Sequence, residues 1–535
     1  MRNKLKSLLI WPPLTGRLEA QVNLITEPLG ISYIAAVLES EGYEVRILDA
    51  LALGSEQIEP LPDGIVRVGL TKEQIKAYIS DYSPDIIGVS CMFSAQEADY
   101  LRVAKLAKEV CPKALVVCGG AHACVCPEAL LGDKNVDIVV RGEGEATFLE
   151  LVKRISETSD YTTVNGTVVR GADGSLLFNS PRKLMKELDK LPFPARHLLP
   201  MERYFEFQKK GRVMYRYYMR KPIANIVTSR GCPYNCVFCA VHQVWSRGWR
   251  GRSSQSIIQE LKFLTKKYGI REFTPWDDNI GYDRQRLEQI CDGLREAGLN
   301  LTWATPNGVY LWNLDEPILR KMRKSGYYRG TFGLESGDPR TLKFIGKPSK
   351  LEKAKRLIAV CDRVGIWTHS SFVIGFPDED FESINKTLNA PSELGLDFAA
   401  FFVAQPYIGT RLRTIFEKEG LLNPGVLEAS WTMFPSYDTK HFTAQELRQF
   451  QQLAYKRFIR GRIIRAFNPF NIGQIIFKIN SPERFWYFLR LISNLFLGVW
   501  VGRAAPLTFS ERVARRWSHL IGKFSLRGLL FGARR

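Results

Sequence analysis

No stretch of this chain is apolar for long enough to cross a membrane as a helix. The best candidate, Phe485–Gly502, contains Arg490 and Asn494, and a span needs about 20 apolar residues. The apolar run near the N-terminus meets Pro12 and Pro13 too soon to form the core of a secretory signal. We therefore expect a cytoplasmic protein, with peripheral contact to the inner face of the membrane left open.

Cysteine is also sparse, with 10 residues in a chain of 535, which does not suggest a disulfide scaffold. The clustering of cysteines in loops favours a reducing compartment and metal chemistry. Cys124 and Cys126 stand without further ligands and are interpreted as structural thiols. A chain of this length, with 45% hydrophobic and 24% charged residues, predicts two to four folded domains.

Acidic residues are scarce at the C-terminal end. Residues 441–535 hold 17 Lys and Arg against 3 Asp and Glu, so most of the formal net charge of +20 lies there. A diffuse basic charge would indicate nucleic acid, but a charge confined to one aromatic-rich tail favours a membrane surface or an acidic partner. Nucleic acid is therefore not the expected partner.

Residues 1–150 alternate between predicted strands and helices, which indicates an α/β, doubly wound, Rossmann-like domain with a parallel sheet. No G-x-G-x-x-G follows the first strand, so a dinucleotide is not expected. Ligands of such sheets bind beyond the carboxyl ends of the strands. The predicted strands are Leu5–Trp11, Glu44–Asp49, Pro84–Ser90, Ala114–Gly120 and Asp137–Gly142.

Residues 151–221 hold turn signals and a proline-punctuated stretch, and are interpreted as a linker or bridging segment. In residues 222–422, six predicted strands alternate with helices, which indicates a partial (β/α)6 barrel. Barrels place their chemistry at the carboxyl ends of the strands, and polar residues gather there. The predicted rim contains Asp277, Asp278, Asn307, Glu335, Ser336, Gly375 and Gln405.

The most specific motif is a C-x3-C-x2-C triplet formed by Cys232, Cys236 and Cys239. Thiolates at this spacing can hold three corners of a [4Fe-4S] cluster, which leaves one iron open to a small molecule. Zinc is the alternative, with His242 as the nearest further ligand. Structural zinc, however, takes four protein ligands and keeps no open position.

With Phe238 before its last cysteine, the triplet resembles the signature of radical S-adenosylmethionine (SAM) enzymes. In that family the open iron binds the amino and carboxylate groups of SAM, and an electron from the cluster releases a 5′-deoxyadenosyl radical. The resemblance implies SAM as a cofactor, and an electron donor such as flavodoxin or ferredoxin. The predicted SAM contacts are Phe238, Glu335, Ser336 and Gly375.

The N-terminal block resembles the cobalamin-binding domain that precedes one large class of radical SAM enzymes. The matching strings are Pro28-Leu29-Gly30, Gly88-Val89-Ser90, Gly119-Gly120-Ala121-His122 and Arg141-Gly142-Glu143-Gly144-Glu145. The resemblance covers about Met1–Leu422, and WDDN, GLESGDPRTL and FVIGFPDED extend it into the barrel. It implies cobalamin contacts at Ser90, Ser94, Gly119, Gly120, Ala121, His122, Gly142 and Glu143.

Many cobalamin proteins supply an axial histidine to cobalt from a D-x-H-x-x-G sequence, which is absent here. A protein histidine ligand to cobalt is therefore not expected. His122 is either a hydrogen-bonding contact of the cofactor or an ordinary polar loop residue.

Residues 423–535 predict a basic, aromatic-rich helical domain, with one helix over Thr443–Ile464. The basic and aromatic residues of Arg512–Arg527 suit a helix in a membrane interface, and equally a helix packed on the barrel.

Together these features predict a cobalamin-dependent radical SAM enzyme, a methyltransferase acting on an unactivated carbon of a small-molecule or lipid-like substrate. One alternative is an oxidative cyclase or hydroxylase resembling the anaerobic magnesium-protoporphyrin ester cyclase. Another, of a different class, is a sensor that binds cobalamin and a cluster without turnover.

Overall fold

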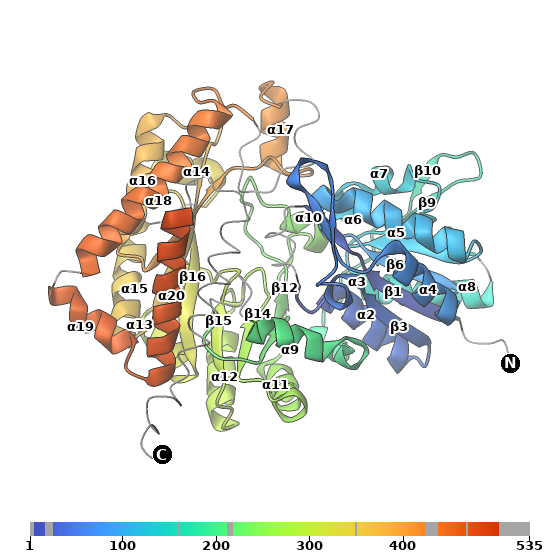
Figure 1. The fold of residues 1–535 in the computed structure, drawn as a ribbon, viewed down its shortest axis with the longest axis horizontal. Helices are drawn as coiled ribbons and strands as arrows, with labels where there is room; N and C mark the ends of the chain where they lie inside the picture. The colour runs from blue at the N-terminus through green and yellow to red at the C-terminus, as the bar shows by residue number, and fades with distance from the viewer. Residues whose placement is uncertain are drawn as a thin grey trace, which may run out of the picture. The chain divides into compact units, whose positions relative to one another are not determined.

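The computed structural model describes residues 5–16, 25–158, 160–210, 218–347, 350–422, 437–466 and 469–501. The chain divides into two compact units, Met1–Lys478 and Ile479–Arg535. The first unit contains both the N-terminal sheet and the barrel, some of whose strands are labelled in Figure 1. The expected tail helix over Arg512–Arg527 lies outside the described residues.

A mixed sheet forms the N-terminal part of the first unit. Among the described strands its order is β10-β9-β8-β7-β6-β1-β3, parallel from β8 to β3 and antiparallel from β8 to β10. The two antiparallel strands come from residues interpreted as linker, so the expected parallel sheet is wider and mixed. The bounds are β1 Lys6–Trp11, β3 Glu44–Asp49, β6 Ile86–Ser90, β7 Leu115–Gly119, β8 Ile138–Val140, β9 Thr167–Arg170 and β10 Leu176–Phe178.

Helices cover both faces of this sheet, which confirms the doubly wound fold. Successive side chains of a strand point to opposite faces, so in β1 Leu9 packs in one core while Leu8 and Ile10 pack in the other. The first core contains α2 (Leu29–Ser40) and α8 (Gly144–Glu157), and the second contains α4 (Lys72–Tyr82) and α5 (Glu97–Val110). The blue elements of Figure 1 are this domain.

Shorter elements connect these layers. The helices are α3 Ala50–Leu53, α6 Ala121–Val125, α7 Pro127–Leu131 and α9 Met201–Lys209, and β2 Leu14–Gly16, β5 Val66–Val68 and β4 Ile58–Pro60 form a small antiparallel sheet. The single 3-10 turns are η1 Pro62–Gly64, η2 Ser94–Gln96, η3 Leu188–Lys190, η4 Arg196–Leu198 and η6 Leu311–Asn313. The expected boundary at residue 150 falls inside α8, and the division into four domains stays a prediction.

A parallel sheet in the order β11-β14-β15-β16-β17-β18 forms the barrel, which confirms the partial (β/α)6 architecture over the described residues. The strands are β11 Ile223–Ile226, β14 Glu272–Pro275, β15 Thr302–Thr305, β16 Tyr327–Glu335, β17 Trp367–Ile374 and β18 Phe398–Val403. The helices are α10 Val241–Trp245, α11 Ser254–Tyr268, α12 Arg284–Glu296, α13 Glu316–Lys324, α14 Pro339–Ile345, α15 Leu351–Val364, α16 Phe381–Leu394 and α17 Arg411–Lys418. The two-residue strands β12 (Ser229–Arg230) and β13 (Arg250–Gly251) pair as an antiparallel hairpin, and the connection between them contains the cysteine triplet and α10.

The open edge of the barrel at β18 is covered by α18 (Ala444–Ala466). Gln451 Nε2 donates to the carbonyl of Phe401 at 2.7 Å, and the Phe401 amide donates to the Tyr455 hydroxyl at 3.2 Å. Such pairing satisfies an edge strand that would otherwise attract another chain.

The next helix, α19 (Pro469–Lys478), is fastened by a buried lysine. Lys478 Nζ lies 2.7 Å from Asp362 Oδ1 and 2.6 Å from Asp397 Oδ2. The helix α20 (Pro482–Val501) belongs to the second unit. Among the described residues, no helix has the length and apolarity required of a transmembrane span.

Four buried charged residues, which we call the Arg196 ion-pair group, join the linker to both domains: Glu27, Arg196, Arg252 and Glu260. Arg196 donates to Glu260 Oε1 at 2.7 Å and to the carbonyl of Asn225 at 2.6 Å, and its Nε lies 3.6 Å from Glu27 Oε2. Arg252 pairs with the other oxygen of Glu260. Burial raises the pKa of Glu27 to about 7, against the opposing charge of Arg196.

Candidate active site

The cysteine triplet lies in a loop, residues 231–240, which we call the cluster loop. The Val237 amide donates to the carbonyl of Ile345 at 2.9 Å, and the Leu412 amide donates to the carbonyl of Val237 at 2.9 Å. Gly231 has a φ of +83°, and a Cβ there would clash with the carbonyl of Gly248. The loop is thus fastened at its start and its centre, while its three thiols stay partly exposed.

Two aspartates of the predicted rim accept hydrogen bonds from residues at and just before the start of this loop. Asp277 is buried after β14 and accepts from the Thr228 amide at 2.7 Å and from the hydroxyls of Thr228 and Ser229. Asp278 Oδ2 accepts from the Gly231 amide at 3.1 Å, and burial raises the pKa of Asp278 to about 6. Both carboxylates are therefore used to position the loop.

The three thiols fit an iron–sulfur cluster better than a zinc ion. Burial raises the pKa of Cys232, Cys236 and Cys239, to about 11 for Cys239, so a bound metal must displace their protons. Both ring nitrogens of His242 are engaged, 2.6 Å from the carbonyl of Tyr234 and 3.0 Å from that of Ser246. Among the described residues, no three His, Cys, Asp or Glu side chains gather tightly enough for a single ion.

Glu335 ends β16 beside the cluster loop, in a left-handed conformation with φ +67°. A non-glycine residue held there is strained, which is typical of functional sites. Its Oε1 lies 2.9 Å from Lys347 Nζ. Burial alone would lower the pKa of Lys347, but the charges of Glu335 and of the thiols at Cys236 and Cys232 raise it. Sequence reasoning missed Lys347, because an isolated lysine in a loop gives no pattern.

Ser336 and Gly375 serve the packing of the barrel in this structure. Ser336 Oγ lies 2.8 Å from Thr387 Oγ1 and accepts from the Asp338 amide at 3.0 Å. Gly375 has a φ of +86°, and the space of a Cβ is taken by Leu447 and Val403, each 3.1 Å away.

The amides of Gly375 and Phe376 donate to Glu379 Oε2 at 2.7 and 3.0 Å. The ring of Phe238 lies 6.3 Å from the ring of Phe376, so the cluster loop reaches the end of β17. Asn307 follows β15 and Gln405 follows β18, and both lie at the carboxyl edge of the barrel as expected from the strand ends. The SAM-contact roles of these residues stay predictions.

The predicted cobalamin contacts divide into two groups. Ser90 and Gly119 are paired in register at the carboxyl ends of β6 and β7, and Gly120, with φ +123°, has no room for a side chain because a Cβ would lie 2.5 Å from the carbonyl oxygen of Cys91. Ala121 begins α6 there. These residues form the edge where ligands of doubly wound sheets bind.

The second group, which includes His122, is engaged with other protein residues. His122 is buried, with Nδ1 3.0 Å from Ser94 Oγ and Nε2 2.9 Å from Glu97 Oε2. The Gly142 amide donates to Cys124 Sγ at 3.1 Å. Both ring nitrogens of His122 thus have partners within the protein, and the absence of a histidine ligand to cobalt stays a prediction.

Glu143 faces the barrel. Its carboxylate lies 2.9 Å from both Arg230 NH1 and Arg250 NH1, and it accepts from the Met185 amide at 3.0 Å. Burial would raise the pKa of Glu143, but the charges of Arg230 and Arg250 outweigh it and the pKa is lowered. The carboxylate is therefore an inter-domain contact here, and a cobalamin contact through it stays a prediction.

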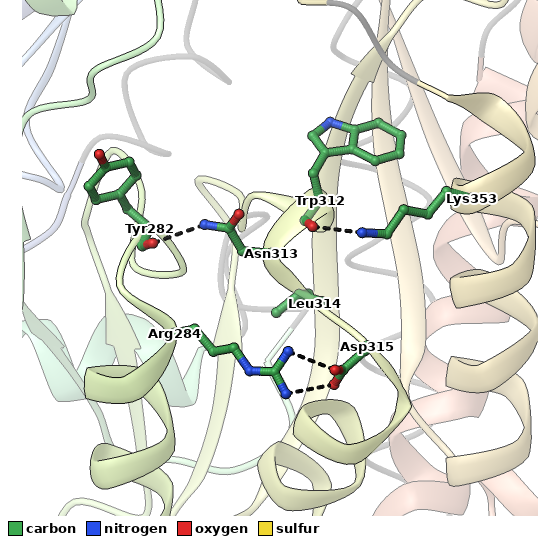
Figure 2. Close-up of a pocket in the computed structure, with 7 residues that line it drawn as sticks. All are labelled: Tyr282, Arg284, Trp312, Asn313, Leu314, Asp315 and Lys353. Carbon is green, nitrogen blue, oxygen red and sulfur yellow. Dashed lines mark hydrogen bonds and ion pairs between the residues drawn. The ribbon is translucent and has the colours of Figure 1, made fainter.

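A separate pocket of about 390 Å³ opens beside α13 (Figure 2). Its cations are engaged: Arg284 NH1 and NH2 lie 2.6 and 3.1 Å from the two oxygens of Asp315, and Lys353 donates to the carbonyl of Trp312 at 2.7 Å. Asn313 donates to the carbonyl of Tyr282 at 2.9 Å. None of the predicted site residues lines this pocket.

Comparison with known proteins identifies the family. Residues 18–152 match the B12 binding domain, and residues 226–390 match the radical SAM superfamily. The chain is 36% identical over 75% of its length to cytidylyl-2-hydroxyethylphosphonate methyltransferase of Streptomyces wedmorensis, covering 79% of that protein. It is 32% identical over 86% of its length to an uncharacterized methyltransferase of Pyrococcus horikoshii, covering 94% of that protein.

More distant similarity supports the same fold. The anaerobic magnesium-protoporphyrin IX monomethyl ester cyclase of Rubrivivax gelatinosus is 26% identical over 74% of this chain and 69% of its own length. The solved structure of OxsB, a cobalamin-dependent SAM radical enzyme with aqua-cobalamin and SAM bound, superposes with a TM-score of 0.66 at 16% identity. That match covers 97% of this chain and 76% of OxsB.

The chain belongs to the cobalamin-dependent radical SAM enzymes, and within them it is a methyltransferase homologue. Its cofactors are cobalamin, a [4Fe-4S] cluster and SAM. The residues fit this set, because the cluster loop offers three thiols with no fourth protein ligand and the carboxyl edge of the first sheet offers glycines.

Proposed function

We propose that this enzyme methylates an unactivated carbon of a small organic molecule. The observation that carries the proposal is that, within one compact unit, α6 at the cobalamin edge contacts α10 directly after the cluster loop. When bound, the cluster and SAM supply the radical that opens a C–H bond, and cobalamin carries the methyl group. A substrate bound between the two would be within reach of both.

The residues of this chain contribute position and charge. Cys232, Cys236 and Cys239 hold the cluster, with Asp277 and Asp278 fixing the loop from below. We propose that Glu335 and Lys347 contact the amino acid end of SAM, with Glu335 accepting from its amino group and Lys347 donating to its carboxylate. The support is that this largely shielded pair of opposite charge lies next to Cys236.

The test is anaerobic reconstitution with iron, sulfide and hydroxocobalamin, followed by incubation of extracts with SAM labelled in its methyl carbon. Methylation predicts a product that gains one labelled CH₂ group, together with 5′-deoxyadenosine. A product that gains oxygen or loses hydrogens would favour the cyclase or hydroxylase reaction instead. Full cofactor loading without any 5′-deoxyadenosine would favour a sensor. The variant with all three cysteines changed to alanine is the negative control.

The reaction also needs an electron, and we propose a flavodoxin or ferredoxin as the donor. The argument is chemical, because the [4Fe-4S] cluster must be reduced by one electron before SAM is cleaved. Replacing dithionite by reduced flavodoxin or ferredoxin should sustain formation of 5′-deoxyadenosine. Activity with dithionite and none with either protein would contradict the proposal.

We also propose that the C-terminal region touches an anionic membrane surface from the cytoplasmic side. Ile463 and Ile464 on α18, and Ile476 and Phe477 on α19, are exposed apolar side chains in the segment that carries most of the excess basic charge. Flotation with vesicles containing phosphatidylglycerol should recover the full-length protein, and neutral vesicles should recover less. Exclusive recovery in the soluble fraction with both vesicles would contradict this.

A further inference from the structure

Arg230 extends from the barrel into the cobalamin-binding domain. It ends β12, two residues before Cys232, and its NH1 lies 2.9 Å from Glu143 Oε1 while its NH2 lies 2.5 Å from Glu145 Oε1. Arg250, opposite Arg230 in the hairpin, shares Glu143 at 2.9 Å. We call these four residues the Arg230 ion-pair group. It brings two positive and two negative charges together across the domain boundary.

The group is shielded from water. The side chains of Arg230, Glu143, Glu145 and Arg250 are 6%, 8%, 8% and 12% exposed. The guanidinium of Arg230 also lies 5.3 Å from the ring centres of Tyr33 and Trp245. Hydrogen bonds between charged groups are directional and strong when shielded in this way, and removal of one partner leaves a buried charge without compensation. Arg230 is therefore held in one orientation.

The residues on either side of this group are those proposed to hold the two cofactors. Glu143 and Glu145 stand at the loop and first turn of α8, directly after Gly142, and Cys232 follows Arg230. At Gly142 a Cβ would lie 3.8 Å from the carbonyl of Val244 in α10, and α10 also contacts α6. α10, which directly follows the cluster loop, thus lies against the cobalamin-binding domain at Gly142 and at α6.

We propose that Arg230, together with Glu143 and Glu145, is a positioning residue that sets the distance and orientation between the [4Fe-4S] cluster and the corrin. This inference rests on the proposed use of both cofactors in one reaction. Its consequence is mechanical: a shift of about 1 Å in the placement of reacting groups can cost on the order of a hundredfold in rate. Arg230 acts through the two loops, and it touches neither substrate nor cofactor in the proposal.

The Arg196 ion-pair group provides a matched control. It is at least as buried and lies within the same unit, but its residues come from the segment before α2, the linker, the residue directly after β13 (Arg252) and α11. Its barrel residue, Glu260, is on α11 and contacts Arg196 and Arg252, not the cluster loop. The Arg196 ion-pair group also bridges the two domains, but Glu260→Gln leaves every contact of the Arg230 ion-pair group in place. It should therefore weaken the fold without changing the spacing that the Arg230 ion-pair group sets.

The experiment compares wild type with Glu145→Gln, Arg230→Lys and the control Glu260→Gln. Each protein is reconstituted with iron, sulfide and hydroxocobalamin and reduced, so that the cluster and cob(II)alamin each carry one unpaired electron. Electron paramagnetic resonance then measures the magnetic coupling of the two spins, which falls steeply with their separation. We expect Glu145→Gln and Arg230→Lys to retain iron and corrin but lose the wild-type coupling, and Glu260→Gln to keep it.

Wild-type coupling in both Glu145→Gln and Arg230→Lys would overturn the inference. An equal change in Glu260→Gln would overturn it too, because any weakening of the fold would then suffice. Should Glu145→Gln fail to fold, Arg230→Lys decides, since it keeps the charge and loses the second hydrogen-bonding arm. Wild-type protein that takes up no corrin would contradict the proposed function itself, which separates that failure from this one.

Discussion

The three cysteines of the cluster loop are partly exposed, whereas Val237 between them is buried and bonded on both sides of its peptide group. Backbone anchors therefore shape the loop before any metal arrives. Such preorganisation lowers the entropy cost of binding a cluster, because the thiols do not have to be gathered from a disordered chain. Binding of the cluster then depends on each of the three thiols.

Cys239→Ala should remove almost all cubane iron, because two thiolates cannot retain a cluster that already has one open iron. Iron and sulfide per chain after anaerobic reconstitution measure this. Cys111→Ala is the control, since Cys111 is a partly exposed thiol in the first domain that is not part of the triplet. Full iron content in Cys239→Ala would contradict the assignment of the triplet.

Lys347→Met should weaken SAM binding by on the order of tenfold, because a charge-assisted hydrogen bond contributes roughly 1.5–3 kcal/mol. Anaerobic equilibrium dialysis of the reconstituted protein with SAM measures the change. The control is Lys190→Met, which removes a lysine from an exposed pair with Glu187. Unchanged affinity in Lys347→Met, with normal iron content, would exclude Lys347 from the SAM site.

Residues whose role depends on a distant partner could not be predicted from the sequence. The three cysteines lie close together in the sequence, so their motif could be recognised. Arg230 and Glu143 form a pair in the structure although they are 87 positions apart in the chain. Glu143 was assigned to cobalamin because it stands in a matching string. A carboxylate in such a string gives no sign of which cation it faces.

At the scale of elements, the strands could be predicted closely. Glu44–Asp49 was predicted with the bounds that the structure has, because an apolar run between turn signals defines a buried strand. β9 and β10 were missed, since short strands among glycine turns resemble a linker. The packing of α18 on the edge of β18 could not be predicted either, because it depends on hydrogen bonds of two side chains, Gln451 and Tyr455, with the backbone of Phe401.

The turn between β17 and α16 (Phe381–Leu394) gives a prediction on pH. Burial raises the pKa of Glu379 to about 7 from an ordinary 4.5, although backbone amides of Gly375 and Phe376 oppose this. The folded state thus holds the proton more tightly than the unfolded state. Its contribution to stability is complete below about pH 4.5 and is lost as the pH rises through about 7.

Glu379→Gln should therefore flatten part of the pH dependence of unfolding. Between pH 5 and pH 8 we expect wild type to lose roughly 2–3 kcal/mol relative to the variant. Denaturant unfolding at both pH values measures the difference, in which buried groups common to both proteins, such as Asp49, cancel. A constant difference between the two proteins across this range would contradict the assignment.

For the molecule as a whole, Lys478 marks the end of the first unit and is itself paired with two aspartates. A chain ending at Lys478 should therefore fold and bind both cobalamin and the cluster. A chain ending at Ala466 removes the lysine and leaves Asp362 and Asp397 with less compensation, which should cost on the order of 3–5 kcal/mol.

Thermal unfolding and cofactor content of the two shortened chains test this boundary. Equal stability of both would show that α19 contributes nothing to the first unit. Failure of the longer chain to bind either cofactor would show that the second unit is needed for the site. The loops proposed to bind the two cofactors all lie before Lys478. Loss of binding in the longer chain could therefore not come from the removal of a cofactor contact in these loops.

Arg196 lies in the connector between the predicted domains, yet its guanidinium neutralises carboxylates from both of them. Recombination between relatives could exchange the corrin-binding domain only together with this connector and with α11, the barrel helix that carries Glu260. A chimera joined at residue 150 would inherit Glu27 from one parent and its buried counter-charge from another. The two domains are therefore expected to be inherited together, and engineered hybrids should be joined at a position other than residue 150.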